Sequence, residues 1–428
     1  MKRSSYWLDT VDVEAAGAAS LPSRADAVII GAGLTGLSAA RALAKRGKRT
    51  VVLEARTIGW GASSRNGGMV LTGLKLEPQA MVAKLGLDDA RALDAISIRA
   101  ISSLEQLVRD ERIDCDFARC GHLALASKPS HYEYFKREAA LIDRAFGRRV
   151  RVVPALELRA EIGSNIYHGG LLDEASAGVN PAKLVAGLAR AARAAGAAIV
   201  EQAPVVSIRQ GAGAPRFTVT TGHGDIAADV VIAATGAYTG VESPWLRKRI
   251  IPIGSYVIAT EPLSPDVASS LAPGKRMMFD SKRFLHYFRV TPDRRMLFGG
   301  RASFVPETDS TTKRSAEILR RDMIEVYPQL ADARIDYAWG GTIDFTADML
   351  PHAGVVDSVH YAVGYAGHGV ALSAYVGAQL AAAIAGSDEG TDPILRRQFP
   401  APAFGVHRLV PGLVSTAGAW YRFLDMVS

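Results

Sequence analysis

The chain has very little cysteine, with only Cys115 and Cys120 among its 428 residues. This excludes a disulfide-rich secreted scaffold, and the spacing of the two residues matches no metal-binding motif. The chain also has no long apolar run. Its most apolar candidate helix, 370–385, is too short and too polar in its first half to be predicted as a membrane span. The N-terminus lacks the apolar stretch of a signal peptide. We therefore expect a cytoplasmic protein without a transmembrane segment or a metal.

The chain has no strong excess of charge either, since 50 Lys and Arg against 43 Asp and Glu leave a formal charge of +7. The densest basic clusters, 148–151 and 247–249, contain no interleaved aromatic residues and no nucleic-acid motif. We read them as solvated surfaces and expect no nucleic-acid partner. Apolar and charged contents of 48% and 22% are typical of a globular protein. The length exceeds one ordinary core, which predicts two domains.

The most informative motif lies in residues 27–36, where an apolar run enters the sequence GxGxxG. The run predicts a buried strand, and the pattern after it predicts a helix over 37–46. Gly31 permits a tight turn, Gly33 lets the backbone approach a pyrophosphate, and Gly36 lets the helix pack on the strand. The helix N-terminus then offers free N–H groups to phosphates.

A second predicted strand, 50–53, ends in Glu54. A carboxylate at this position can accept hydrogen bonds from ribose hydroxyls and repels a 2′-phosphate. NADP is therefore disfavoured, and both FAD and NAD stay open on this motif alone.

Three further segments favour a flavin. The loop 59–68 (GWGASSRNGG) carries four glycines, a tryptophan and an Arg–Asn pair, and its backbone N–H groups can bind an anion or a polar ring edge. The predicted strand 229–234 ends in Thr235-Gly236, which lets the chain turn beside a cofactor. The segment 364–370 (GYAGHGV) places glycines and His368 at the start of an apolar helix, whose N-terminus favours negative charge on a flavin ring.

The remaining pattern alternates between two styles. Nucleotide-type strand and helix segments, including an Ala-rich helix over 181–195, are interrupted over 250–300 by short strands separated by prolines and charges. This predicts an α/β protein with a discontinuous Rossmann-like cofactor domain and an inserted α+β domain on a mostly antiparallel sheet. The predicted boundaries are 1–88, 150–245 and 332–428 for the cofactor domain, and 89–149 and 246–331 for the substrate domain.

These motifs, together with WGGTIDFTADMLPHAG over 339–354 and the tail 419–421, resemble the D-amino-acid-oxidase (DAO) superfamily of flavoproteins. Within it, the chain is most similar to γ-glutamylputrescine oxidoreductase-type amine oxidases, whose hallmark loop reads GASGRNGG. The resemblance implies the GR2/DAO type of fold and FAD as cofactor. The motifs and the resemblance place the FAD contacts at Gly31, Ala32, Gly33, Leu34, Thr35, Gly36, Glu54, Ala55, Arg56, Gly61, Ala62, Ser63, Arg65, Asn66, Gly67, Gly68, Val205, Ala234, Thr235, Gly236, Gly341, Gly364, Gly367, His368, Gly369 and Val370.

The chain departs from some members of the superfamily. Related sarcosine oxidases tether the flavin through a cysteine near Gly340, and related demethylases use a histidine in the first glycine-rich loop. Neither residue is present, which predicts non-covalent FAD. The sarcosine-oxidase lysine associated with oxygen activation falls near Leu297, which leaves the electron acceptor open.

The candidate catalytic residues are His368, Arg65 and Tyr287, although His368 could equally be a hydrogen-bonded structural residue. The substrate is expected between the flavin and the antiparallel sheet, with candidate contacts at Tyr256, His286, Tyr287, Arg289 and Arg301. A buried arginine beside aromatic residues suits a substrate carboxylate, while ordinary strand salt bridges are the alternative for Arg289 and Arg301.

The predicted function is oxidation of an amine or amino-acid C–N bond to an imine, with O2 reduced to H2O2 and a substrate like γ-glutamylputrescine. Three alternatives stay open. They are oxidation of a cyclic or N-methylated amino acid, a dehydrogenase that passes electrons to a quinone or carrier, and a flavin-binding protein without turnover.

Overall fold

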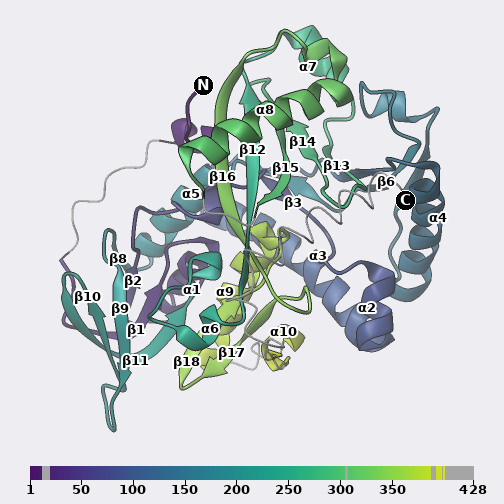
Figure 1. Cartoon of the computed structure of the whole chain (residues 1–428). Helices are drawn as coiled ribbons and strands as arrows, with labels where there is room; N and C mark the ends of the chain where they lie inside the picture. The colour runs from purple at the N-terminus through teal and green to yellow at the C-terminus, as the bar shows by residue number, and fades with distance from the viewer. Residues whose placement is uncertain (12–19, 304–306, 387–391, 398, 401–428) are drawn as a thin grey trace.

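The computed structural model describes residues 1–11, 20–303, 307–386, 392–397 and 399–400. Two large sheets organise these residues, and in Figure 1 the first lies at the lower left and the second in the upper half of the molecule. The predicted tail motif at 419–421 lies outside the described residues.

The first sheet is built around a parallel core. Its strands, in spatial order, are β17 (His352–Val356), β18 (Val359–Val363), β11 (Gly224–Ala233), β1 (Arg24–Ile30), β2 (Thr50–Leu53) and β8 (Ala198–Val200), with β10 (Phe217–Thr221) and β9 (Val205–Gln210) continuing from β11. β1 pairs in parallel with both β2 and β11, so their C-terminal ends meet at one edge. Every residue of β2 is buried, as expected for a strand covered on both faces.

Helices cover one face of this sheet. They are α1 (Leu34–Ala44), α5 (Pro181–Ala194), α9 (Gly369–Ile384) and α3 (Leu87–Asp110). α1 packs against both α9 and α5, and α3 packs against α9, around one apolar core. α5 starts at a proline preceded by Asn180, whose side chain accepts hydrogen bonds from the N–H groups of Ala182 and Lys183.

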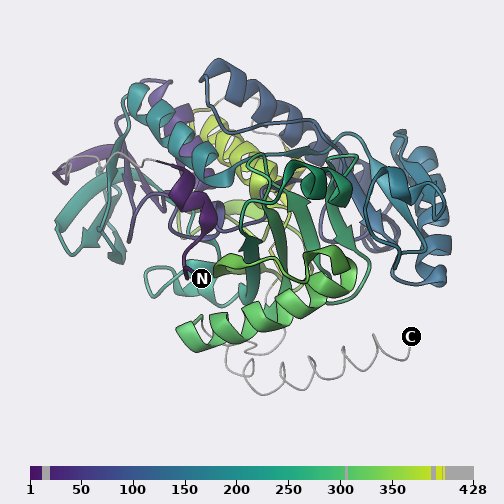
Figure 2. The same cartoon turned by 90° about the horizontal axis from the view of Figure 1, so that it is seen from above.

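The second sheet is antiparallel except between two strands. Its order is β16 (Ile335–Phe345), β12 (Ile251–Thr260), β15 (Met296–Ser303), β14 (Tyr287–Val290), β13 (Met277–Asp280), β4 (His122–Leu125), β6 (Gly169–Asp173) and β5 (Arg151–Pro154), with β13 and β4 parallel. Helices α8 (Asp309–Val326) and α7 (Pro265–Leu271) pack on one face, and Figure 2 shows the green helix α8 along one side of these strands.

This sheet takes β5 and β6 from the range 150–245 and β16 from the range 332–428, which the sequence assigns to the cofactor domain. Because strands from the ranges of both predicted domains share this sheet, the domain boundaries stay a prediction.

Smaller elements lie outside the two large sheets and their main helices. These are β3 (Met69–Val70), β7 (Ala177–Gly178), α2 (Pro78–Leu85), α4 (Pro129–Leu141), α6 (Pro244–Arg247) and α10 (Pro393–Arg396). The sequence pattern predicts one helical stretch near 78–110. The structure divides it into α2 and α3 at Gly86, whose φ of +83° ends the first helix. Within the described residues, no helix is both long and apolar enough to cross a membrane.

Candidate functional site

The turn between β1 and α1 can be made only with glycine at two of its positions. Gly31 has a φ of +105°, and a Cβ there would lie 2.8 Å from the carbonyl oxygen of Ala234. A Cβ on Gly36 would lie 2.0 Å from the carbonyl oxygen of Gly31, which is far inside van der Waals contact. The close approach of β1, β11 and α1 therefore depends on these two glycines.

Glu54 at the end of β2 closes the other side of this turn. Its carboxylate accepts hydrogen bonds from the N–H of Ala32 at 2.8 Å and the N–H of Arg56 at 2.9 Å. Burial raises the pKa of Glu54 above its ordinary value, although these N–H donors oppose that shift. The carboxylate thus lies directly beside the backbone of the glycine turn.

The loop 59–68 is held tightly by its own side chains. Arg65 donates from Nε to the carbonyl of Trp60 at 2.8 Å and from Nη1 to the carbonyl of Gly340 at 2.9 Å. Its Nη1 also lies 3.1 Å from Oε2 of Glu307. Asn66 donates to the carbonyls of Ala62 and Ser63, at 3.1 and 3.0 Å. Arg65 is therefore engaged within the protein rather than free to bind a reactant.

Two tryptophans, neither of them a predicted site residue, hold the same loop. The indole N–H of Trp7 donates to the carbonyl of Asn66 at 2.8 Å, and that of Trp339 donates to the carbonyl of Arg65 at 2.9 Å. Both side chains are fully buried. No sequence signal links them to the loop, because they come from the N-terminal segment and from β16.

The segment 364–370 faces this loop across the cavity. The carboxylate of Asp344 accepts a hydrogen bond from the N–H of Gly364 at 2.6 Å, and the hydroxyl groups of Tyr365 and Thr35 lie 3.0 Å apart. His368 precedes α9, and its Nδ1 is buried without a hydrogen-bond partner among the described residues. Burial, followed by the charge of Lys75, lowers the pKa of His368 to about 3, so the imidazole is neutral at physiological pH.

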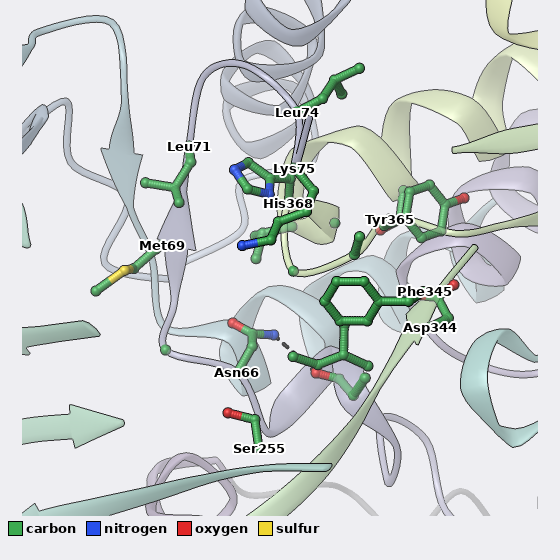
Figure 3. Close-up of a pocket in the computed structure, with 18 of the residues that line it drawn as sticks. Asn66, Met69, Leu71, Leu74, Lys75, Ser255, Asp344, Phe345, Tyr365 and His368 are labelled. Carbon is green, nitrogen blue, oxygen red and sulfur yellow. Dashed lines mark hydrogen bonds between the residues drawn. The ribbon is translucent and has the colours of Figure 1, made fainter. Parts of the chain in front are cut away.

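These segments line one cavity of about 1190 Å³. Figure 3 shows Lys75 beside His368, with Leu71 and Leu74 nearby and Asn66 and Ser255 on the opposite side. All but three of the predicted cofactor residues line this cavity, and so do the candidate catalytic residues. The exceptions are Gly36, Gly68 and Gly364, which lie behind the lining; a Cβ on Gly68 would be 2.3 Å from the carbonyl of Val179.

Tyr287 is the predicted substrate contact that lines the cavity. Its hydroxyl lies 3.2 Å from Oγ of Ser255, and a Cβ on Gly67 would lie 3.1 Å from its ring. Burial raises the pKa of Tyr287 to about 12, so its hydroxyl stays protonated.

Three other predicted substrate contacts, Tyr256, Arg289 and His286, are not among the residues that line the cavity, and their contact with a substrate stays a prediction. Tyr256 is buried against α8 and donates to Oγ1 of Thr311 at 3.1 Å. Arg289 is buried and donates to the carbonyls of Gly68 and Val179, each at 3.0 Å. Arg289 thus fastens two backbone segments and does not form a strand salt bridge.

His286 is held between two carboxylates, with Nδ1 3.0 Å from Asp280 and Nε2 3.3 Å from Asp322. Burial alone would lower the pKa of His286, but the two hydrogen bonds outweigh it and raise the pKa to about 9. Arg301 lies in β15, and its side chain is outside the described part of the structure.

The profile of a protein family described as FAD-dependent oxidoreductase (DAO) matches residues 26–383 of this chain. The chain belongs to this family. The probable oxidoreductase OrdL of Haemophilus influenzae is 34% identical over 94% of this chain and 92% of its own length. The γ-glutamylputrescine oxidoreductase of Escherichia coli is 32% identical over the same shares.

Solved structures of the family show the same fold. The crystal structure of glycine oxidase from Geobacillus kaustophilus superposes with a TM-score of 0.75 and 22% identity, covering 88% of this chain and all of the other. The predicted fold class and the predicted family are thereby confirmed. The protein is an FAD-dependent oxidoreductase of the amine and amino-acid oxidase kind.

The cavity suits FAD. Its volume of about 1190 Å³ exceeds that of ordinary ligand pockets and leaves room for a dinucleotide. The glycine turn at β1 and the carboxylate of Glu54 are the parts of a dinucleotide site, and the buried, unpartnered Nδ1 of His368 offers a polar atom at its other end.

Proposed function

We propose that the protein oxidises the C–N bond of an amine to an imine. Water then hydrolyses the imine to an aldehyde or keto product and releases ammonia or an amine. O2 takes up the two electrons and two protons and becomes H2O2. The proposed substrate resembles γ-glutamylputrescine. The supporting observation is one cavity that joins a dinucleotide turn to a region lined by His368, Leu71 and Leu74, in a chain 32% identical to a γ-glutamylputrescine oxidoreductase.

The bound FAD would supply the electron acceptor for the C–N oxidation. The N–H groups at the start of α1 would bind its pyrophosphate, Glu54 its ribose hydroxyls and Val205 its adenine. The segments 65–67 and 367–369 would position its ring system. We assign Arg65 a positioning role, since its guanidinium is already bound to two carbonyls and to Glu307.

His368 and Tyr287 would contact the reactants. With a pKa of about 3, His368 is a weak proton acceptor and a neutral hydrogen-bonding group. Tyr287 keeps its proton and can donate a hydrogen bond. Neither residue is suited to act as a strong base, so the amine would react in its unprotonated form, and the protein would act mainly by positioning it.

The first experiment mixes the purified holoenzyme with a panel of amines under anaerobic conditions and follows the visible absorbance of the flavin. We expect bleaching by primary amines on a four-carbon chain, followed in air by one H2O2 for each amine consumed. Absence of bleaching by any amine would overturn the proposal. Bleaching without H2O2 would instead indicate a dehydrogenase with another electron acceptor.

A second experiment concerns the attachment of the cofactor. Cys115 and Cys120 are free, and neither lines the cavity. We expect acid or heat denaturation to release all of the FAD into the supernatant. Flavin that stays with the precipitated protein would contradict non-covalent binding.

A further inference from the structure

The charged side chains that line the cavity differ in whether they have partners. Arg148 lies 2.9 Å from Asp94 and also pairs with Asp173. Lys282 lies 3.9 Å from Asp280. These charges, like that of Arg65, are satisfied within the protein and are not available to a ligand.

Lys75 is different. It lies in the connection between β3 and α2, lines the cavity, and makes no hydrogen bond or ion pair with any described residue. Its neighbours Leu71 and Leu74 are apolar, and Figure 3 shows its side chain beside the imidazole of His368. Burial lowers the pKa of Lys75. A partly buried ammonium without a hydrogen bond or ion pair is costly, and an incoming anion would lower that cost.

Glu138 is a second charged side chain of this kind, with the opposite charge to that of Lys75. It lies on α4, lines the same cavity, and likewise has no hydrogen bond or ion pair among the described residues. Burial, followed by the charge of Glu77, raises the pKa of Glu138 to about 7. The charge of Glu77 also acts on Lys75, so Lys75 and Glu138 share one charged neighbour. Glu77 itself accepts a hydrogen bond from the hydroxyl of Tyr134 at 2.8 Å.

We propose that Lys75 binds a carboxylate and Glu138 a second ammonium on the part of the substrate away from the reacting amine. The preferred substrate is then an amine whose chain also carries a zwitterionic α-amino-acid group. This rests on the proposed function and deepens it, because it assigns the selectivity of the cavity to two charged side chains that line it from separate segments. Substrates without either charge leave both groups unpaired and lose affinity.

Three substrates that share one reacting amine separate the two contacts. γ-Glutamylputrescine carries both charges, glutarylputrescine only the carboxylate, and butyrylputrescine neither. We expect the wild-type holoenzyme to prefer them in that order, with about a 10- to 100-fold difference in kcat/KM for each charged contact.

The variants Lys75→Met and Glu138→Gln test each residue against the matched controls Lys84→Met on α2 and Glu133→Gln on α4, which do not line the cavity. Lys75→Met is expected to lower the glutaryl-to-butyryl ratio of kcat/KM about 10- to 100-fold. Glu138→Gln is expected to lower the γ-glutamyl-to-glutaryl ratio about tenfold. Both controls should leave the two ratios unchanged.

Several outcomes would overturn this assignment while the proposed function stands. One is a wild-type enzyme that oxidises butyrylputrescine with the same kcat/KM as γ-glutamylputrescine. Another is a Lys75→Met variant that loses activity on all three substrates equally, which would indicate an effect on the cofactor or on folding. FAD content and visible spectra of each variant show whether the site has formed. If no amine bleaches the flavin of the wild type, the proposed function itself fails, and this inference with it.

Discussion

The two ends of the cavity differ in how their polar groups are paired. At the dinucleotide end, the turn of β1 and the carboxylate of Glu54 are bound to one another through backbone groups at 2.8–2.9 Å, with glycines removing every side chain that would intrude. At the other end, Lys75 and Glu138 line the cavity without a hydrogen bond or ion pair to any residue that the structure describes. An end made of satisfied backbone groups suits a constant cofactor, whereas unpaired side-chain charges suit a substrate that must be selected and released. The following predictions test this contrast.

The largest effect is expected at the dinucleotide end. In Gly36→Ala the new Cβ would lie 2.0 Å from the carbonyl of Gly31, so β1 and α1 must move apart. We expect loss of most bound FAD and a destabilisation of more than about 3 kcal/mol. Flavin absorbance per chain and thermal unfolding measure both. Gly213→Ala, where a Cβ meets nothing within 4 Å, is the control and should change stability by less than about 0.5 kcal/mol. A Gly36→Ala protein with full FAD content would contradict the packing argument.

Arg289 tests whether a buried cation beside the cavity serves structure rather than substrate. Replacing it with Met leaves the carbonyl of Val179 without this donor, while the carbonyl of Gly68 keeps only the N–H of Val179. We expect a loss of about 2–4 kcal/mol in the free energy of unfolding, measured with urea. The glutaryl-to-butyryl ratio of kcat/KM should stay unchanged in the same variant. A fall in that ratio as large as the one expected for Lys75→Met would indicate that Arg289 contacts the substrate.

The pH dependence of selectivity tests the substrate end. The pKa of Glu138 is raised to about 7, chiefly by burial and then by Glu77, while Arg148 opposes the shift. Glu138 is therefore neutral below pH 7 and charged above it. The γ-glutamyl-to-glutaryl ratio of kcat/KM should rise up to about tenfold between pH 6 and pH 8.

Taking this ratio cancels the titrations that both substrates share, namely those of the reacting amine and of Lys75. Glu77 and Tyr134 also line this part of the cavity, and both are unchanged in every measurement that is compared. Glu138→Gln should flatten the profile. An unchanged slope in that variant would assign the titration to another group.

The smallest effect is expected from Trp339→Phe, which keeps the buried ring but removes one hydrogen bond to the carbonyl of Arg65. We expect a loss of about 1–2 kcal/mol in stability and slightly weaker FAD binding, measured by urea unfolding and by FAD titration of the apoprotein. Tyr337→Phe, at a partly exposed position on the same strand, is the comparison. Selectivity among the three substrates should not change in either variant.

Local sequence predicted the dinucleotide end well, because its chemistry is local. A strand that ends in GxGxxG needs its glycines whatever surrounds it, and the next strand brings Glu54 to the same edge because parallel neighbours end together. The proline and Asn180 at the start of α5 are equally local signals, and the structure has the helix at that place. Gly86, by contrast, divides the helical stretch predicted near 78–110 into two helices. The spacing of apolar residues does not indicate that this glycine has a positive φ.

The sequence by itself therefore determined the cofactor turn, the family and the alternation of two sheet types. Only the tertiary structure decided which side chains face the cavity. Tyr256 and Arg289 lie on strands of the expected sheet, yet strand periodicity does not say which face is covered by α8 or by the backbone at Val179. Lys75 and Glu138 carry no motif, because they line one cavity only after the β3–α2 connection and α4 have folded around it. A contact between distant segments depends on packing, and packing has no signature in any single stretch of the chain.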